Sequence, residues 1–201
     1  SDAFGVSVAI EGERILIGAS GHDWDHGQAH LFDTTTGGLL HTFDNSPADR
    51  WDYFGHSVAI DGNHILIGEF GDNTQGEDVG QAHLFDATSY NLIRTFNDPT
   101  PTDGDSFGLG IALHDNIVLI GARRDDTAGT DVGQAHVFDA LTGDLLQTLN
   151  DPTASEEDYF GRAVAAAGDY FVVGAYQHDT GSFEDIGQAH IFENPFGARP
   201  V

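Results

Sequence analysis

The amino-acid sequence predicts an all-β protein, a β-propeller built from four four-stranded blades of which the last is incomplete. A Phe-Gly pair recurs about every 53 residues, a motif beginning Gly-Gln-Ala-His follows each pair, and no stretch shows a sustained helical period of apolar residues. The pairs begin at Phe4, Phe54, Phe107 and Phe160, and the second motifs begin at Gly27, Gly80, Gly133 and Gly187. We therefore expect one domain, 1–201, with repeats at about 4–53, 54–106, 107–159 and 160–201.

The second repeat shows the order of the expected elements most clearly. Residues 57–60 and the apolar run 65–68 flank a short Asp-Gly-Asn-His turn and predict a tight hairpin. Because the second run is apolar throughout, we expect it to be buried on both faces. The alternating residues 81–85 predict a half-exposed third strand, and residues 92–96 predict a fourth.

Four short antiparallel strands per repeat are typical of a propeller blade, whose faces are buried against the neighbouring blades. The predicted core of the second blade is Val58, Ile60, Ile65 and Ile67, and that of the first blade is Val8, Ile10, Ile15 and Ile17. One histidine per third strand shares its face with a phenylalanine and is expected to cover the neighbouring blade, with its polar tip hydrogen-bonded. These histidines are His30, His83, His136 and His190. A ring of histidines that senses pH is the alternative.

The composition excludes several classes of function. Lys and Arg number 7 against 33 Asp and Glu, which gives a net charge of −26. Such a surface repels nucleic acid and anionic lipid, and either attracts divalent cations or reflects adaptation to high salt. No apolar run is long enough to predict a membrane span. The sequence starts at Ser1 without a basic segment and an apolar stretch, as expected of a mature or excised product or of a chain that never carried a signal.

The pattern Phe-Gly-x-Ser-Val-Ala, followed by Ile-Gly-Ala in place of Gly-Ala-Pro, resembles the FG-GAP repeat of integrin α-subunit heads and of bacterial secreted or surface-anchored proteins. The resemblance implies a β-propeller at an extracellular or cell-surface location. It also implies a non-enzymatic role in structure, adhesion or self-assembly, with a glycan or a cell-surface protein as a partner. The family includes adhesins, assembly modules and domains attached to enzymes, so the resemblance specifies the fold more closely than the function.

Acidic residues gather in the loop between the second and third strands of each repeat. Integrin-type repeats instead carry calcium between the first two strands, but those turns are too short here to enclose an ion that takes six to eight oxygen ligands. We therefore expect calcium in the later loops, where Asp-Asp-x-x-Gly-x-Asp resembles a form common in bacterial FG-GAP proteins. The candidate ligands are Asp72, Asn73, Glu77, Asp78, Asp125, Asp126, Asp131, Asp179 and Asp185. The alternative is that these residues only build turns.

A second recurring acid stands two residues before each Phe-Gly pair. These residues are Asp2, Asp52, Asp105 and Asp158. We expect each to cap a turn that leads into the first strand of its blade, with a role in a metal site as the alternative.

Signals of catalysis are few. The chain has no Lys and no Cys, which removes a Schiff-base lysine and a thiol nucleophile, and the predicted protein is not an enzyme. Three histidines, His22, His26 and His30, form a weaker candidate site for zinc or copper. Loop aromatics support an alternative function in carbohydrate binding or polysaccharide cleavage. They are Trp24, Trp51, Tyr53 and Tyr159.

The last repeat lacks a recognisable fourth strand, because residues 194–201 contain two prolines and are expected to serve only as an edge strand or an arm. The chain then has fifteen evident strands where four complete blades need sixteen. Three arrangements follow: a small closed ring, an excised part of a larger propeller, or completion by another copy. We expect a homo-oligomer or filament formed through the open fourth blade.

Overall fold

The computed structural model describes residues 2–45, 50–179 and 185–197. Within these residues the chain forms fifteen strands and one short helix, α1 (His22–Asp25), and this confirms the number and order of the predicted strands. The described part of the chain therefore holds no helix long enough to cross a membrane. The third strand of the second repeat was wrongly predicted to be half-exposed: residues 81–85 are buried, because neighbouring blades cover both faces of this strand.

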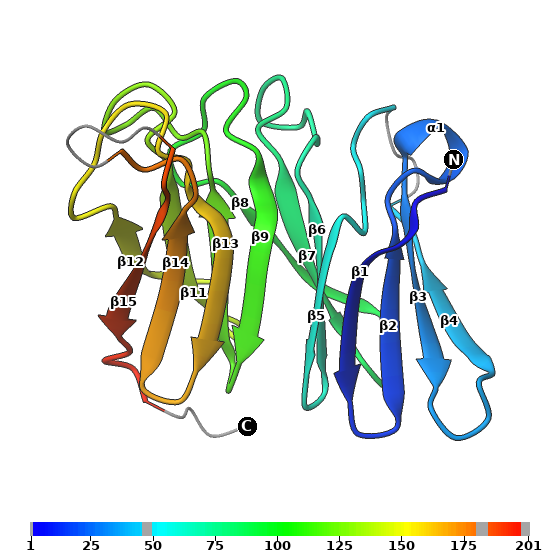
Figure 1. The fold of residues 1–201 in the computed structure, drawn as a ribbon. Helices are drawn as coiled ribbons and strands as arrows, with labels where there is room; N and C mark the ends of the chain where they lie inside the picture. The colour runs from blue at the N-terminus through cyan, green and yellow to red at the C-terminus, as the bar shows by residue number, and fades with distance from the viewer. Residues whose placement is uncertain (1, 46–49, 180–184, 198–201) are drawn as a thin grey trace.

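The strands form four antiparallel sheets in chain order, which we call blades 1 to 4 (Figure 1). Blade 1 contains β1 (Phe4–Glu11), β2 (Arg14–Ala19), β3 (Gln28–Asp33) and β4 (Leu39–Phe43). Blade 2 contains β5 (Ser57–Asp61), β6 (His64–Glu69), β7 (Gln81–Asp86) and β8 (Leu92–Asn97). Blade 3 contains β9 (Phe107–His114), β10 (Ile117–Ala122), β11 (Gln134–Asp139) and β12 (Leu145–Asn150). Blade 4 contains β13 (Phe160–Ala167), β14 (Tyr170–Ala175) and β15 (Gln188–Glu193).

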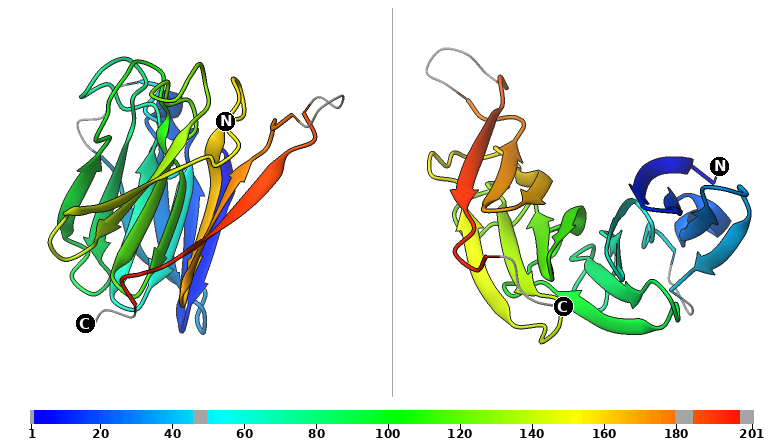
Figure 2. Two further views of the ribbon diagram at one scale, coloured as in Figure 1. Left: turned by 90° about the vertical axis from the view of Figure 1, so that its left-hand side faces the viewer. Right: turned by 90° about the horizontal axis from the view of Figure 1, so that it is seen from below.

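The blades stand side by side along an open arc, with blades 1 and 4 at its two ends (Figure 2). The first strands of adjacent blades contact one another along the arc. Of the three predicted arrangements, closure of the four blades on themselves is not observed among the described residues. Residues 194–197 add no strand to blade 4, and residues 198–201 lie outside the described part of the chain.

The apolar core lies between blades and consists of three clusters, one at each junction. We call the face of a blade that meets the preceding blade its front face, and the face that meets the next blade its back face. At the first junction, Leu31 and Phe43 on the back face of blade 1 pack with Ile65 and Ile67 on the front face of blade 2. The other two junctions repeat this pattern.

The predicted core of blade 1 is wrong at two of its four positions. Val8 is 68% exposed and Ile10 is 69% exposed, whereas Val58 and Ile60 at the same positions of blade 2 are partly buried and pack against the first junction. The reason is positional, because Val8 and Ile10 lie on the front face of blade 1 and no described segment of the chain covers that face.

Two glycines explain why the sequence motifs recur. Gly108 of the third Phe-Gly pair lies against the carbonyl of Gln81, and Gly80 lies against the carbonyl of Phe107, so a Cβ atom at either glycine would collide with the neighbouring blade's backbone. Both glycines have a left-handed backbone, with φ of +90° and +89°. The Phe-Gly and Gly-Gln motifs are therefore the two halves of one backbone contact between blades.

Candidate functional site

The acidic loops between the second and third strands are closed by their own side chains. The Asn73 Oδ1 atom accepts a hydrogen bond from the Asp78 N–H at 2.8 Å, and the Asp126 Oδ1 atom accepts one from the Asp131 N–H at 2.7 Å. The same bond recurs in blade 4, where the Asp179 Oδ1 atom accepts the Asp185 N–H at 2.7 Å. One oxygen of each first residue is thus used in shaping the loop, as in the turn-building alternative.

The same loops present backbone carbonyls to the next blade. The Asp78 carbonyl accepts the Ser106 N–H at 3.2 Å, and the Val79 carbonyl accepts the Phe107 N–H at 2.8 Å. The carbonyls of Asp131 and Val132 accept the corresponding bonds from blade 4. The left-handed backbone at Asp78 and Asp131, with φ of 52° and 50°, belongs to this docking geometry. Glu77 also takes part through its backbone, and its N–H donates a hydrogen bond to the Asp103 Oδ1 atom at 3.0 Å.

Beside these contacts, a buried polar cluster lies at each junction between two blades. Each cluster combines a residue after the last strand of the earlier blade, the acid before the Phe-Gly pair, a residue after the second strand, and the third-strand histidine. The first cluster contains Asn45, Asp52, Glu69, Asp72 and His83, the second contains Asp98, Asp105, Asp125 and His136, and the third contains Asp151, Asp158, His178 and His190. Of the predicted loop ligands, only Asp72 and Asp125 belong to these clusters.

In the first cluster, Glu69 is the central group. The His83 Nε2 atom lies 2.6 Å from the Glu69 Oε2 atom, and the Asn45 side-chain amide donates to both Glu69 oxygens, at 3.1 Å and 2.9 Å. One carboxylate oxygen each from Asp52, Glu69 and Asp72 lie within 4.8 Å of one another. This cluster therefore offers an all-oxygen set of the kind that calcium takes.

In the third cluster, each histidine faces a carboxylate. The His178 Nδ1 atom lies 3.1 Å from the Asp158 Oδ2 atom, and the His190 Nε2 atom lies 3.2 Å from the Asp151 Oδ1 atom. Asp158 also accepts hydrogen bonds from the backbone N–H and hydroxyl of Ser155, in the turn-capping role predicted for it.

The second cluster differs from both. The His136 Nε2 atom makes no hydrogen bond within the described residues and lies 3.9 Å from the Asp98 Oδ1 atom. Ala122 occupies the position of Glu69, as Ala175 does in the third cluster. Burial raises the pKa of Asp98 to about 7 and that of Asp105 to about 6, and burial lowers the pKa of His136 to about 4. The imidazole is therefore neutral at pH 7, beside carboxyl groups whose charges oppose one another.

A family model for the FG-GAP repeat matches residues 1–32, 46–85, 100–138 and 146–192, and each match contains one Phe-Gly pair and one Gly-Gln-Ala-His motif. The chain belongs to the FG-GAP repeat family. A search of curated proteins found no match. Within the described residues, the Phe-Gly pairs of repeats 2 to 4 and the Gly-Gln-Ala-His motifs of repeats 1 to 3 lie where two blades meet.

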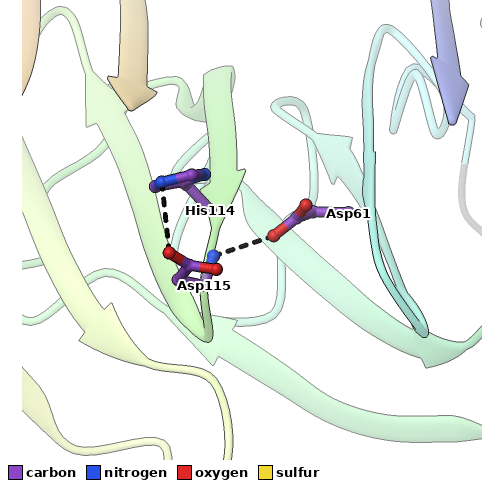
Figure 3. A group of neighbouring side chains, drawn as sticks. All are labelled: Asp61, His114 and Asp115. Carbon is purple, nitrogen blue, oxygen red and sulfur yellow. Dashed lines mark hydrogen bonds and ion pairs between the residues drawn. The ribbon is translucent and has the colours of Figure 1, made fainter. Parts of the chain in front are cut away.

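The turns between the first two strands of these FG-GAP repeats link neighbouring blades. Figure 3 shows Asp61, His114 and Asp115 there, with the Asp61 Oδ2 atom accepting the Asp115 N–H at 2.8 Å and the His114 Nε2 atom 3.3 Å from the Asp115 Oδ2 atom. The His114 Nε2 atom also accepts the Gly168 N–H at 2.8 Å. These groups join the ends of blades 2, 3 and 4.

The three first-repeat histidines are not brought into one group within the described residues. The Nδ1 atom of His22 lies 3.7 Å from the Asp2 Oδ2 atom, and the Nδ1 atom of His26 lies 3.7 Å from the Asp23 Oδ2 atom. The third-strand residue His30 instead contacts Thr42, with its Nδ1 atom 3.1 Å from the Thr42 Oγ1 atom. His83 and His136 make the same contact with a threonine, which confirms the predicted hydrogen-bonded tip.

The loop aromatics divide into two kinds. Tyr53 stacks on Phe70 with ring centroids 4.8 Å apart, and Tyr159 stacks on Tyr176 at 5.5 Å. Both tyrosines therefore use a ring face within the chain. Trp24 is exposed, with the Arg50 guanidinium 5.1 Å from its ring centroid.

Proposed function

We propose that this FG-GAP chain is a non-enzymatic structural module that assembles head to tail. In the assembly, the front face of blade 1 in one copy docks on the back face of blade 4 in another. The observation that carries the proposal is that both terminal faces keep the residues of an internal junction while remaining exposed.

The front face of blade 1 has the parts of an internal front face. Val8 and Ile10 occupy the positions of Val58 and Ile60, and Gly5 has a φ of +88°, close to the +90° of Gly108. Gly108 lies against the preceding blade, whereas a Cβ atom at Gly5 would meet no atom of the described residues within 4 Å. Gly5 is thus shaped for a close backbone approach that its own chain does not supply.

Within the described part of the chain, the back face of blade 4 keeps part of the complementary surface, without the fourth strand that supplies Phe43, Phe96 or Leu149 at the internal junctions. Ile191 is 71% exposed, although Leu84 and Val137 at the same position of blades 2 and 3 are fully buried. Ile186 is 55% exposed, although Val79 at its position is buried at a junction. Exposed apolar surface of this kind marks an interaction site.

A second copy is the occupant that fits both faces at once. Each internal front face in the chain is covered by a back face, so the free front face of one copy matches the free back face of another. Propellers have four to eight blades. Because the two ends of this arc lie apart, the smallest closed ring of whole copies is a dimer with eight blades (Figure 2).

We place this assembly outside the cell, at a surface or in a secreted layer, where it meets a glycan or a cell-surface protein. The family resemblance and the net charge of −26 support this part of the proposal. Calcium is the proposed stabilising ion, and the set Asp52, Glu69 and Asp72 supports its placement at the junction between blades 1 and 2.

The exposed Trp24 and Trp51 support carbohydrate binding as the second candidate function, because an indole ring stacks on the apolar face of a sugar. An array of neutral and anionic glycans, probed with the wild-type chain and with the Trp24→Ala variant, tests this candidate. Binding that is lost in the variant favours it, and an array without binding excludes it for those glycans.

Paired variants test the head-to-tail assembly directly. Val8→Asp places a charge on the front face of blade 1, and Ile191→Asp places one on the back face of blade 4. We expect each variant alone to be monomeric in sedimentation velocity, and an equimolar mixture to form a dimer, because each variant keeps the face that the other has lost.

The Leu141→Asp variant is the matched control, since Leu141 is an exposed leucine in the turn between β11 and β12, away from the terminal faces. It should assemble as the wild type does. A mixture of the two face variants that stays monomeric, under conditions in which the wild type associates, would refute head-to-tail docking.

A further inference from the structure

The cluster between blades 2 and 3 is the one junction cluster in which a fully buried imidazole Nε2 atom has no hydrogen-bond partner among the described residues. The His136 side chain is fully buried, and so is that of Asp98, whose Oδ2 atom also lacks a partner. A buried polar atom without a partner costs free energy, which points to a missing ligand.

In the neighbouring clusters a carboxylate meets the third-strand histidine. At the first junction the histidine meets Glu69, and at the third junction His190 meets Asp151 at 3.2 Å. At the second junction Ala122 stands at the Glu69 position, as Ala175 does at the third junction. The His136 Nε2 atom and the Asp98 Oδ1 atom are 3.9 Å apart, too far for a hydrogen bond, so at this junction neither acid meets the imidazole.

The remaining groups are arranged as metal ligands are. One atom each of Asp98, Asp125 and His136 lie within 4.8 Å of one another, and all three residues are buried. Two ligands held at about 2.0–2.2 Å from a tetrahedral ion are themselves roughly 3.5 Å apart, so a small movement brings these three onto one ion.

Groups around the cluster hold two of these side chains in place. The His136 Nδ1 atom lies 3.1 Å from the Thr148 hydroxyl, which orients the ring and leaves Nε2 directed at Asp98. The Thr100 hydroxyl donates to the Asp125 Oδ2 atom at 3.0 Å. Such outer contacts are typical of metal-binding histidines and carboxylates.

We propose that Asp98, Asp125 and His136 bind a divalent transition-metal ion of the zinc class at the junction between blades 2 and 3. The imidazole decides the class, because calcium and magnesium prefer oxygen ligands whereas zinc accepts a mixed set of nitrogen and oxygen. The ion would join the two blades, since Asp98 follows the last strand of blade 2 and the other two ligands belong to blade 3.

Zinc titration of the tag-free chain, in competition with a chromophoric chelator, tests the proposal. We expect one tight ion per chain, and binding weakened about 100-fold or more by Asp98→Asn and by His136→Gln. Asp98→Asn is the variant least expected to unfold, because Asn45 occupies the same position at the first junction. His30→Gln is the matched control, because His30 is the third-strand histidine of blade 1, and it should leave the affinity unchanged.

Cobalt substitution and thermal unfolding give readouts independent of affinity. Bound Co²⁺ should give the intense visible absorption of a four-coordinate site in the wild type and lose it in Asp98→Asn. Zinc should raise the Tm of the wild type but not that of the variant. Equal zinc affinity in the wild type and Asp98→Asn overturns the site, and tighter binding of calcium than of zinc overturns the class of ion. Neither result depends on whether the chain assembles.

Discussion

The junction between blades 2 and 3 and the free front face of blade 1 use nearly the same residues in opposite environments. At the junction, Ile120 is fully buried and Gly108 lies against the backbone of blade 2. On the free face, Ile17 at the position of Ile120 is only partly buried, and Gly5 contacts no other blade in the part of the chain that the structure describes. The difference shows that the repeated residues make the contacts between blades. They become buried only when a second blade packs against them.

The largest expected effect is a loss of stability when the second-strand isoleucine that is buried at a junction is replaced, compared with the same replacement on the free face of blade 1. Ile67→Ala removes a fully buried side chain at the first junction and should lower the free energy of unfolding by about 2–5 kcal/mol. Ile17→Ala, at the same position of blade 1, should cost no more than about 1.5 kcal/mol, because part of that side chain already meets water. Urea unfolding at a dilution that keeps the chain monomeric measures both, and equal losses would contradict the comparison.

A smaller effect is expected at the second-strand glycine. A Cβ atom at Gly121 would collide with the Gly161 carbonyl of blade 4, whereas one at Gly174 would find only ordinary contacts of 3.7 Å or more. Gly121→Ala should therefore lower the free energy of unfolding by about 1–3 kcal/mol, and Gly174→Ala should change it by roughly 0.5 kcal/mol or less. Thermal unfolding of the two variants under identical conditions makes the comparison, and a Gly174→Ala variant as unstable as Gly121→Ala would contradict it.

Replacement of Gly174 should affect assembly while leaving the stability of the monomer nearly unchanged. In a head-to-tail assembly, Gly174 of one copy would lie against the Gly5 carbonyl of the next, as Gly121 lies against Gly161 within the chain. Gly174→Ala should then weaken self-association about tenfold, roughly 1.4 kcal/mol, while the monomer stays folded. Sedimentation equilibrium gives the association constant, and an unchanged constant would argue for another mode of contact.

The smallest expected effect concerns calcium at the junction between blades 1 and 2. At 1 mM calcium, a site in the range of extracellular modules should stabilise the chain by about 0.4–1.4 kcal/mol. Asp72→Asn should abolish this gain, whereas Asp126→Asn, in a loop whose carboxylate accepts a backbone N–H, should leave it unchanged. Calorimetry with calcium and with a chelator measures the shift, and the proposal fails if the wild type shows none.

Local patterns in the sequence were sufficient to predict the strands and the orientation of the third-strand histidines. Alternation and turn residues act over a few positions, so the hairpin formed by β5 and β6 and the contact of His83 with Thr95 follow from nearby residues. Burial depends on a neighbouring blade, and for that reason Val8 and Ile10 were wrongly predicted to lie in the core.

The buried polar clusters were harder to predict because their members come from two blades and are far apart in the sequence. Asp98 and His136 are 38 positions apart and meet only when blade 3 docks on blade 2. The recurring Asn-Asp-Pro-Thr segment at residues 97–100 and 150–153 was the available signal, since it repeats a carboxylate at the same exit from a blade. The exposed Asp126 was predicted to be a calcium ligand because it lies in an acidic loop. The sequence did not reveal that its carboxylate accepts a hydrogen bond from the Asp131 backbone N–H.

The mass of the wild-type chain in solution, measured by light scattering over a range of concentrations, tests the central claim most directly. Because each copy carries a charge of −26, the series should be run at raised ionic strength, where repulsion between copies is screened. We predict a mass of two or more chains that falls to that of one chain on dilution or after Val8→Asp. A mass of one chain at every concentration and salt level would contradict assembly through the terminal blades.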